Sequence, residues 1–139
     1  MKNIALTLAL TILLAACSSG GGSTVVELPN NLTGVFNGTY ESQNGDDSGS
    51  ITLNLAQALD GTDLTGVVTV DADVPGVCLG NGAITTGSVS GFSANITAGQ
   101  AEGTVVFQLT FDNENTLTGT YVASDCSNAT GAGSITVSR

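Results

Sequence analysis

The chain has 139 residues, of which two are Lys or Arg, twelve are Asp or Glu and none is His, so its formal net charge is −10 at pH 7. Two basic residues cannot form a patch that neutralises phosphates, which excludes nucleic acid binding and charge-driven docking on anionic lipids. The lack of histidine excludes Ser-His-Asp and Cys-His catalysis and histidine-based zinc sites. Gly, Thr, Ser, Val and Ile dominate and helix formers are scarce, which is typical of an all-β protein.

The first sixteen residues have the pattern of a signal peptide. A positive start is followed by an uncharged run of apolar and small residues, 4–16 (IALTLALTILLAA). A membrane-spanning helix needs about 20 apolar residues, so this run is too short to be one. The run ends in Leu14-Ala15-Ala16-Cys17, which resembles the lipobox of bacterial lipoproteins. The resemblance implies diacylglycerol on the Cys17 sulfur, cleavage just before Cys17 and acylation of the new amino group.

Lipid on Cys17 would anchor the mature chain, because two or more acyl chains bind a membrane stably whereas one binds only marginally. Ser18, not Asp, follows the cysteine, and in the lipoprotein-sorting pattern this favours the outer membrane of a Gram-negative cell. An ordinary secretory signal, with Cys17 incidental, is the alternative. Cleavage would remove Lys2 and leave Arg139 as the single basic residue against twelve acidic ones, a net charge near −11 (1 − 12). We therefore predict a lipid-anchored protein of the cell envelope, at the outer membrane.

The mature chain divides into a tether and one domain. Residues 17–31 (CSSGGGSTVVELPNN) are rich in Gly and Ser, a composition typical of a flexible coil, which would hold the domain clear of the lipid surface. The domain follows at residues 32–139, where apolar and polar residues alternate in short runs separated by turn residues. This two-residue period is typical of strands buried on one face. We predict eight strands, at residues 34–42, 49–58, 63–72, 82–90, 91–98, 102–112, 116–124 and 132–138.

The first and last predicted hairpins share a sequence pattern. Gly38-Thr39-Tyr40 followed by Gly49-Ser50-Ile51-Thr52 returns as Gly119-Thr120-Tyr121 followed by Gly133-Ser134-Ile135-Thr136. Short, evenly spaced strands with glycine near their starts favour an antiparallel meander closed on itself, because closure removes exposed sheet edges. We therefore predict an all-β fold, an eight-stranded antiparallel up-and-down β-barrel, with a β-sandwich as the alternative.

In strand number, length and its Gly-x-Tyr opening, the domain resembles small barrels of the lipocalin and avidin type. The resemblance implies the architecture alone. Avidin-like biotin sites use several tryptophans and lipocalins open with Gly-x-Trp, whereas this chain has no Trp. No ligand-binding residue is therefore carried over from either family.

Cys78 and Cys126 are the two cysteines left once Cys17 is lipidated. An even pair in an exported chain is typical of a disulfide. Closing a loop of about 49 residues would stabilise the fold by roughly 4 kcal/mol in the chain-entropy model. A metal site on the same pair would lack further ligands, because there is no His and no third thiol. We expect the bridge to join the long connection 71–82 to the connection before the last strand, at one end of the barrel.

Acidic side chains occur in pairs in the predicted turns, and such pairs can serve acid–base catalysis or a surface Ca²⁺ site. None follows the calcium-loop spacing, so solvated loop charge is the preferred interpretation. We predict no catalytic residue, no metal site and no cofactor. The pairs are Asp46/Asp47, Asp60/Asp63, Asp71/Asp73 and Asp112/Glu114.

All six aromatic residues fall on the predicted inward-facing positions of their strands. They could line a ligand pocket, but we expect them to fill the barrel, because an eight-stranded barrel is only wide enough inside for its own side chains. The six are Phe36, Tyr40, Phe92, Phe107, Phe111 and Tyr121.

An anchor, a stiff scaffold and missing catalytic groups together indicate a non-enzymatic binding or interaction module. We expect it to act through the loop end that the disulfide would pin, since rigid loops on a barrel rim suit recognition. The candidate partner is an envelope protein, and the sequence names no ligand. Three alternatives stay open: a carrier of small hydrophobic ligands with a hollow interior, an envelope protease inhibitor, and an enzyme that uses buried carboxylates.

Overall fold

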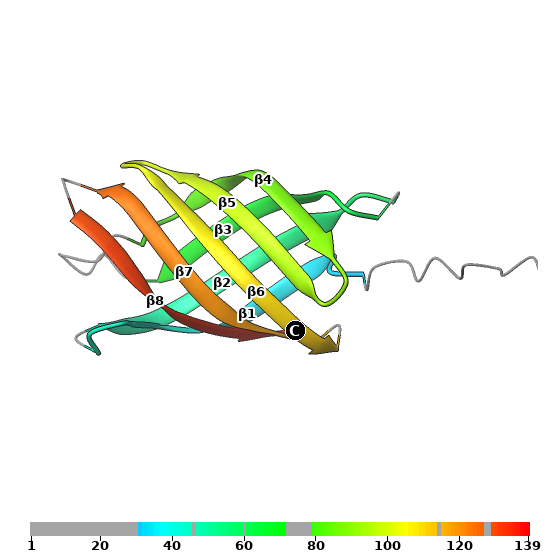
Figure 1. Ribbon diagram of the computed structural model, residues 1–139, viewed down its shortest axis with the longest axis horizontal. Helices are drawn as coiled ribbons and strands as arrows, with labels where there is room; N and C mark the ends of the chain where they lie inside the picture. Colours follow the sequence, from blue (N-terminus) through cyan, green and yellow to red (C-terminus); the bar gives the residue numbers. More distant parts are fainter. Residues whose placement is uncertain (1–30, 46, 60, 72–78, 114, 127–128) are drawn as a thin grey trace, which may run out of the picture.

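The computed structural model describes residues 31–45, 47–59, 61–71, 79–113, 115–126 and 129–139, with the backbone alone at residues 112, 125, 126, 129 and 130. These residues form eight strands (Figure 1). Each strand pairs antiparallel with the next and β8 pairs with β1, so one sheet closes into a barrel. The strands are β1 (Gly34–Ser42), β2 (Ser48–Gln57), β3 (Leu64–Asp71), β4 (Gly82–Ser90), β5 (Ser93–Gln100), β6 (Thr104–Asn113), β7 (Thr116–Cys126) and β8 (Ala129–Ser138).

The closed ring confirms the predicted up-and-down barrel, and the β-sandwich alternative is wrong because a single sheet encloses the core. Most strand ends differ from the predicted bounds by one to three residues, and the largest difference is in the β7–β8 hairpin. β7 and β8 extend to Cys126 and Ala129, which pair with each other. The apolar alternation fades before these residues, but backbone pairing needs no apolar side chain and therefore continues further along the hairpin. Within the described chain, no helix is long and apolar enough to cross a membrane.

The barrel interior is filled by apolar side chains from alternate positions of the strands, as the two-residue period predicts. Among the described residues, no polar or charged residue is buried. Three rings are in contact inside the barrel. The Tyr40 and Tyr121 centroids lie 6.1 Å apart at 86°, and the Phe107 and Tyr121 centroids lie 6.4 Å apart. These rings come from β1, β6 and β7, while the opposite wall contributes smaller side chains such as Val68 and Ile96.

Phe92 corrects the prediction that all six aromatic side chains face inward, because it is 62% exposed. Residues 91–98 were expected to form a strand, but β5 begins at Ser93. Gly91 has a φ of +56°, so the chain turns there and Phe92 lies at the tip of the β4–β5 turn. Side chains in a turn do not alternate between the two faces of a sheet as those of a strand do. The even spacing that predicts an inward-facing Phe92 therefore does not apply at this residue. The other five aromatic residues are buried as expected.

The up-and-down topology divides the connections between the two ends of the barrel. The entry rim is the end where residue 31 leads into β1 and Arg139 ends the chain, together with connections 58–63, 91–92 and 114–115. The far rim is the opposite end, with connections 43–47, 72–81, 101–103 and 127–128. Arg139 joins the two chain ends at the entry rim. Its guanidinium donates to the Thr33 carbonyl oxygen at 2.8 Å and lies 5.2 Å from the centre of the Phe36 ring.

Candidate functional site

Two tyrosines from the repeated hairpins lie side by side inside the barrel, towards the far rim. The register pairs Tyr40 with Gly49 across β1 and β2, and Tyr121 with Gly133 across β7 and β8. Each glycine leaves room for the ring beside it. A Cβ on Gly49 would lie 2.8 Å from Tyr40 Cε1, and a Cβ on Gly133 would lie 2.7 Å from Tyr121 Cε1. The two hairpins that share a sequence pattern therefore also share a packing arrangement, in which a tyrosine ring covers the glycine opposite it on the neighbouring strand.

Asp47 lies above this pair, in the connection between β1 and β2. Ser42 holds the turn closed, because its amide donates to the Asp47 carbonyl oxygen at 2.7 Å and its hydroxyl oxygen accepts from the Asp47 amide at 3.2 Å. The Tyr40 hydroxyl donates a long hydrogen bond of 3.4 Å to Asp47 Oδ2. The three groups Tyr40, Tyr121 and Asp47 form what we call the tyrosine–aspartate cluster.

The surroundings of the cluster keep both hydroxyls protonated. Burial raises the pKa of Tyr121 to about 12, with further contributions from Tyr40 and the charge of Asp47. Burial also raises the pKa of Tyr40, and the charge of Asp47 and its hydrogen bond to the hydroxyl add to the effect. A phenol with a raised pKa is a poor base or nucleophile at neutral pH. The cluster can therefore donate hydrogen bonds, but it is not activated for proton transfer.

The raised pKa values predict a loss of stability at high pH. Both tyrosines, which are the only two in the chain, ionise near 10 in the unfolded state, whereas folded Tyr121 ionises at about 12. The folded state therefore holds more protons between these values, and stability that is complete below pH 10 falls as the pH rises through 12. We expect this fall to be smaller in Tyr121→Phe.

Absorbance titration of the phenolate at 295 nm measures the two groups directly. The Tyr40→Phe variant isolates Tyr121, and the Tyr121→Phe variant isolates Tyr40. Asp47→Asn should lower both pKa values, because the carboxylate raises each. If both groups of the folded protein titrated at 10, the described burial would be wrong.

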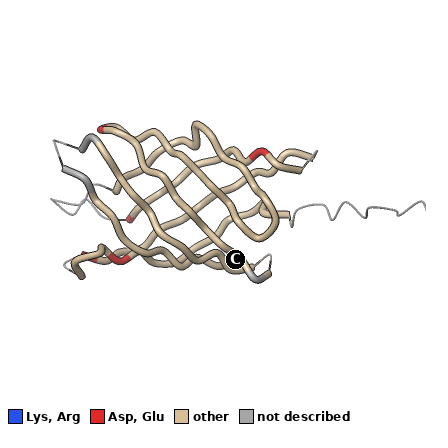
Figure 2. The backbone as a smooth tube through the Cα atoms, viewed as in Figure 1, with Lys and Arg blue, Asp and Glu red and all other residues tan. Residues whose placement is uncertain are grey.

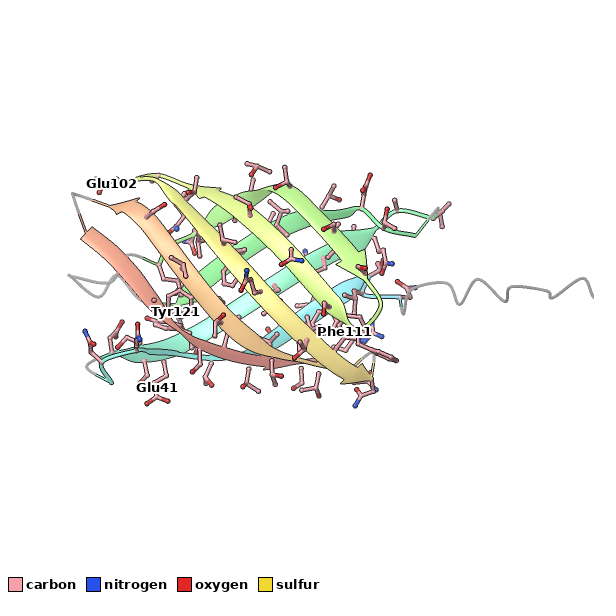
Figure 3. The ribbon with its side chains drawn as sticks, in the orientation of Figure 1. Glu41, Glu102, Phe111 and Tyr121 are labelled. Atoms are coloured by element: carbon pink, nitrogen blue, oxygen red, sulfur yellow. The ribbon has the colours of Figure 1, made fainter. Side chains whose placement is uncertain are left out.

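Acidic side chains surround the far rim. Glu41, Asp71 and Glu102 are exposed and Asp47 is half-buried. Glu41 lies in β1, Asp71 ends β3, and Glu102 lies in the connection between β5 and β6, so the carboxylates come from separate parts of the rim. Figure 2 shows this distribution, and Figure 3 shows Glu41 and Glu102 at the end of the barrel away from Phe111. The far rim is thus a ring of separate negative charges over a core of apolar side chains.

Gln100 adds a buried donor to the same rim. Its Nε2 atom is buried and has no hydrogen-bond partner among the described residues. A Cβ on Gly80 would lie 3.0 Å from Gln100 Oε1, so the amide lies against the end of the β3–β4 connection. A buried amide nitrogen normally has a partner, and the described residues supply none to Gln100.

The predicted carboxylate pairs are only partly within the described chain. Asp47, Asp63 and Asp71 are described, whereas Asp46, Asp60, Asp73 and Glu114 lie outside the described residues, as does the side chain of Asp112. The predictions of acid–base or Ca²⁺ chemistry at these pairs therefore stay predictions. Across the described ranges, no group of three or more His, Cys, Asp or Glu side chains is placed to hold a metal ion.

The predicted disulfide also lies outside the described residues, because Cys78 falls in the gap 72–78 and the Cys126 side chain is not described. β3 ends at Asp71 and β7 ends at Cys126, both at the far rim. In the closed strand order, the ends of β3 and β7 are on opposite sides of that rim. A Cys78–Cys126 disulfide would therefore link two opposite sides of the far rim.

Sequence reasoning missed the tyrosine–aspartate cluster as a unit, although it singled out each member. The sequence predicts Tyr40 in the core and Asp47 in a solvated turn. A usable signal was present, since seven residues separate them across a predicted tight hairpin, and Gly49 follows Asp47 by two residues.

The chain matches no protein-family model, and a search of curated proteins finds no significant match.

Proposed function

We propose that the protein is a lipid-anchored, non-enzymatic interaction module of the cell envelope, held at the outer membrane by Cys17, which binds a partner through its far rim. The observation that carries the proposal is the arrangement of the two rims. Residue 31, where the predicted tether joins the domain, lies at the entry rim, and the far rim with its acidic side chains is at the opposite end of the barrel (Figure 1).

The chemistry of the far rim indicates the kind of partner. Glu41, Asp71 and Glu102 are exposed there, and the mature chain would carry one basic residue against twelve acidic ones. Complementary charge steers encounter and selects partners more than it adds raw affinity. A protein of the envelope that exposes Lys or Arg side chains fits this surface, and its binding should weaken as salt screens the charges.

Two of the other functions considered from the sequence, the ligand carrier and the carboxylate enzyme, are less well supported. The contacts among the Tyr40, Phe107 and Tyr121 rings fill that part of the interior, which argues against a carrier with a hollow centre. No described Asp or Glu is buried, which argues against an enzyme that uses paired buried carboxylates.

Site-specific photocrosslinking in the native envelope tests the proposal. A photoreactive residue is placed at exposed Gln43 on the far rim or at exposed Thr62 on the entry rim, in the acylated full chain. We expect a discrete crosslinked partner from Gln43 alone. The signal should fall with rising salt and in a Glu41→Gln, Asp71→Asn double variant, which leaves the core untouched. Equal crosslinks from both rims, or a signal indifferent to salt and to the double variant, would contradict the proposal.

The anchor has a separate test. Metabolic labelling with a palmitate analogue should mark the native chain and leave Cys17→Ala unlabelled. A labelled Cys17→Ala variant, or an unlabelled native chain that keeps residues 1–16, would refute the lipid anchor without bearing on the far rim.

A further inference from the structure

Two large apolar side chains project from the entry rim. Leu59, in the connection between β2 and β3, is fully exposed, and Phe92, at the tip of the β4–β5 turn, is 62% exposed. The described connections of the far rim carry no exposed large apolar side chain; the remaining examples, Val35, Val67, Val106 and Val122, lie on strands. Exposed apolar side chains are unremarkable singly. Here two occupy two connections of the same rim.

Both tips are held by backbone contacts, so their exposure is part of the fold. The β2–β3 connection is closed by hydrogen bonds from the Ala58 amide to the Asp63 carbonyl oxygen at 2.9 Å and from the Gly61 amide to the Ala58 carbonyl oxygen at 3.0 Å. It is fixed to the end of β4 because the Val89 amide donates to the Thr62 carbonyl oxygen at 2.7 Å. The two tips therefore lie on neighbouring parts of the same rim.

Phe92 is fixed in a similar way. The Phe111 amide donates to the Phe92 carbonyl oxygen at 3.0 Å, and the two rings meet edge to face with centroids 6.0 Å apart. Phe111 is buried, so one edge of the Phe92 ring continues the core while the rest reaches solvent. Figure 3 shows Phe111 at this end of the barrel, far from Glu41 and Glu102.

The chain outside the described residues indicates what these tips meet. The described chain begins at residue 31, on the same rim, and 14 peptide bonds, across residues 18–30, separate it from Cys17. A Gly/Ser-rich coil of that length has a root-mean-square span of about 20 Å and a fully extended limit of about 49 Å. A lipid anchor on Cys17 would therefore keep the bilayer surface near the entry rim, at a high effective concentration.

We propose that Leu59 and Phe92 insert into the lipid interface, so that the barrel docks on the membrane by its entry rim and presents the far rim outwards. The inference rests on the lipid anchor of the proposed function and adds a second contact with the same membrane, in place of the separation from the lipid surface that the tether's composition predicts. Asp63, exposed beside the Leu59 loop, and the acidity of the chain disfavour anionic lipid. The surface recognised is a zwitterionic bilayer, and docking weakens as anionic lipid is added.

A single tryptophan reports the docking, because the chain has no Trp of its own. The acylated mature chain with Phe92→Trp is reconstituted in phosphatidylcholine vesicles. We expect its emission to shift to the blue and to be quenched by brominated acyl chains. The matched control is Val122→Trp, which replaces a 52% exposed side chain on the barrel wall and should show neither effect. Adding Leu59→Ser to Phe92→Trp should move the docking equilibrium about tenfold towards the undocked state.

Each contrary outcome overturns the inference. Flotation of the vesicles shows whether the protein is bound to them. If the Phe92→Trp protein floats with the vesicles but its emission matches that of the Val122→Trp control, the tips do not meet lipid. If the shift depends on protein density and brominated lipid does not quench it, the tips meet a second copy. If the acylated chain does not float with the vesicles, the natural lipid anchor is absent. The emission of Phe92→Trp is then measured on the chain that begins at Cys17, with a maleimide lipid coupled to the Cys17 sulfur. A water-exposed probe in that chain also refutes the docking.

Discussion

Replacing Gly38 or Gly119 by alanine is expected to destabilise the barrel by about 2–3 kcal/mol. The two glycines hold the same place in the repeated hairpins. A Cβ on Gly38 would overlap the Thr136 carbonyl oxygen of β8, and a Cβ on Gly119 would overlap the Gln108 carbonyl oxygen of β6. In both cases the obstacle is backbone of the strand outside the glycine's own hairpin, which cannot yield as a flexible side chain would.

Denaturant unfolding followed by far-ultraviolet circular dichroism measures the effect. Gly99→Ala is the matched control, because its Cβ would meet only Thr85 Cγ2, at 3.4 Å, without overlap. Its free energy of unfolding should stay within about 0.5 kcal/mol of the parent. If Gly38→Ala were as stable as Gly99→Ala, the close approach of β1 to β8 would be wrong.

The second large effect is expected for Tyr121→Ala, which should lower the free energy of unfolding by about 3–5 kcal/mol. The ring contacts both Tyr40 and Phe107 and covers Gly133, which has no side chain to fill the space. The truncation therefore leaves a cavity that neighbouring strands cannot close without breaking their register.

Two variants separate this packing effect from other causes. Tyr121→Phe keeps the ring and should lose much less stability than Tyr121→Ala. Phe92→Ala removes a ring of similar size that is 62% exposed, and it should change the free energy of unfolding by about 1 kcal/mol or less. Equal losses for Phe92→Ala and Tyr121→Ala would show that the aromatic cluster is not the centre of the core.

The repeated hairpins explain why both predictions come in pairs. β1 and β2 match β7 and β8 in register as well as in sequence, since Gly38 pairs with Ile51 and Gly119 pairs with Ile135. β1 and β8 also pair directly. The two related hairpins thus meet at the seam that closes the barrel, and each contributes one tyrosine to the same interior cluster. Closure and core filling are therefore provided by one sequence pattern used twice.

The candidate site was predictable only in part. The sequence predicts recognition at the loop end that carries Cys78 and Cys126, which stays a prediction, and it singles out Tyr40, Tyr121 and Asp47 one by one. It did not show that Asp47 lies over the tyrosines, because that contact depends on how the β1–β2 turn folds back. It also placed Phe92 inside, because a turn at Gly91 breaks the parity that the prediction assumed.

The strand pattern along the chain was sufficient to predict the all-β class, the number of strands and the faces that form the core. Those features are local, since side chains two residues apart share a face of a strand and burial follows from that period. The register of the β1–β8 pair, the meeting of Tyr40 with Tyr121, and the position of Leu59 and Phe92 on one rim became visible in the folded barrel. They join residues far apart in the sequence, and their positions depend on the register in which the strands pair around the barrel, which no local pattern encodes.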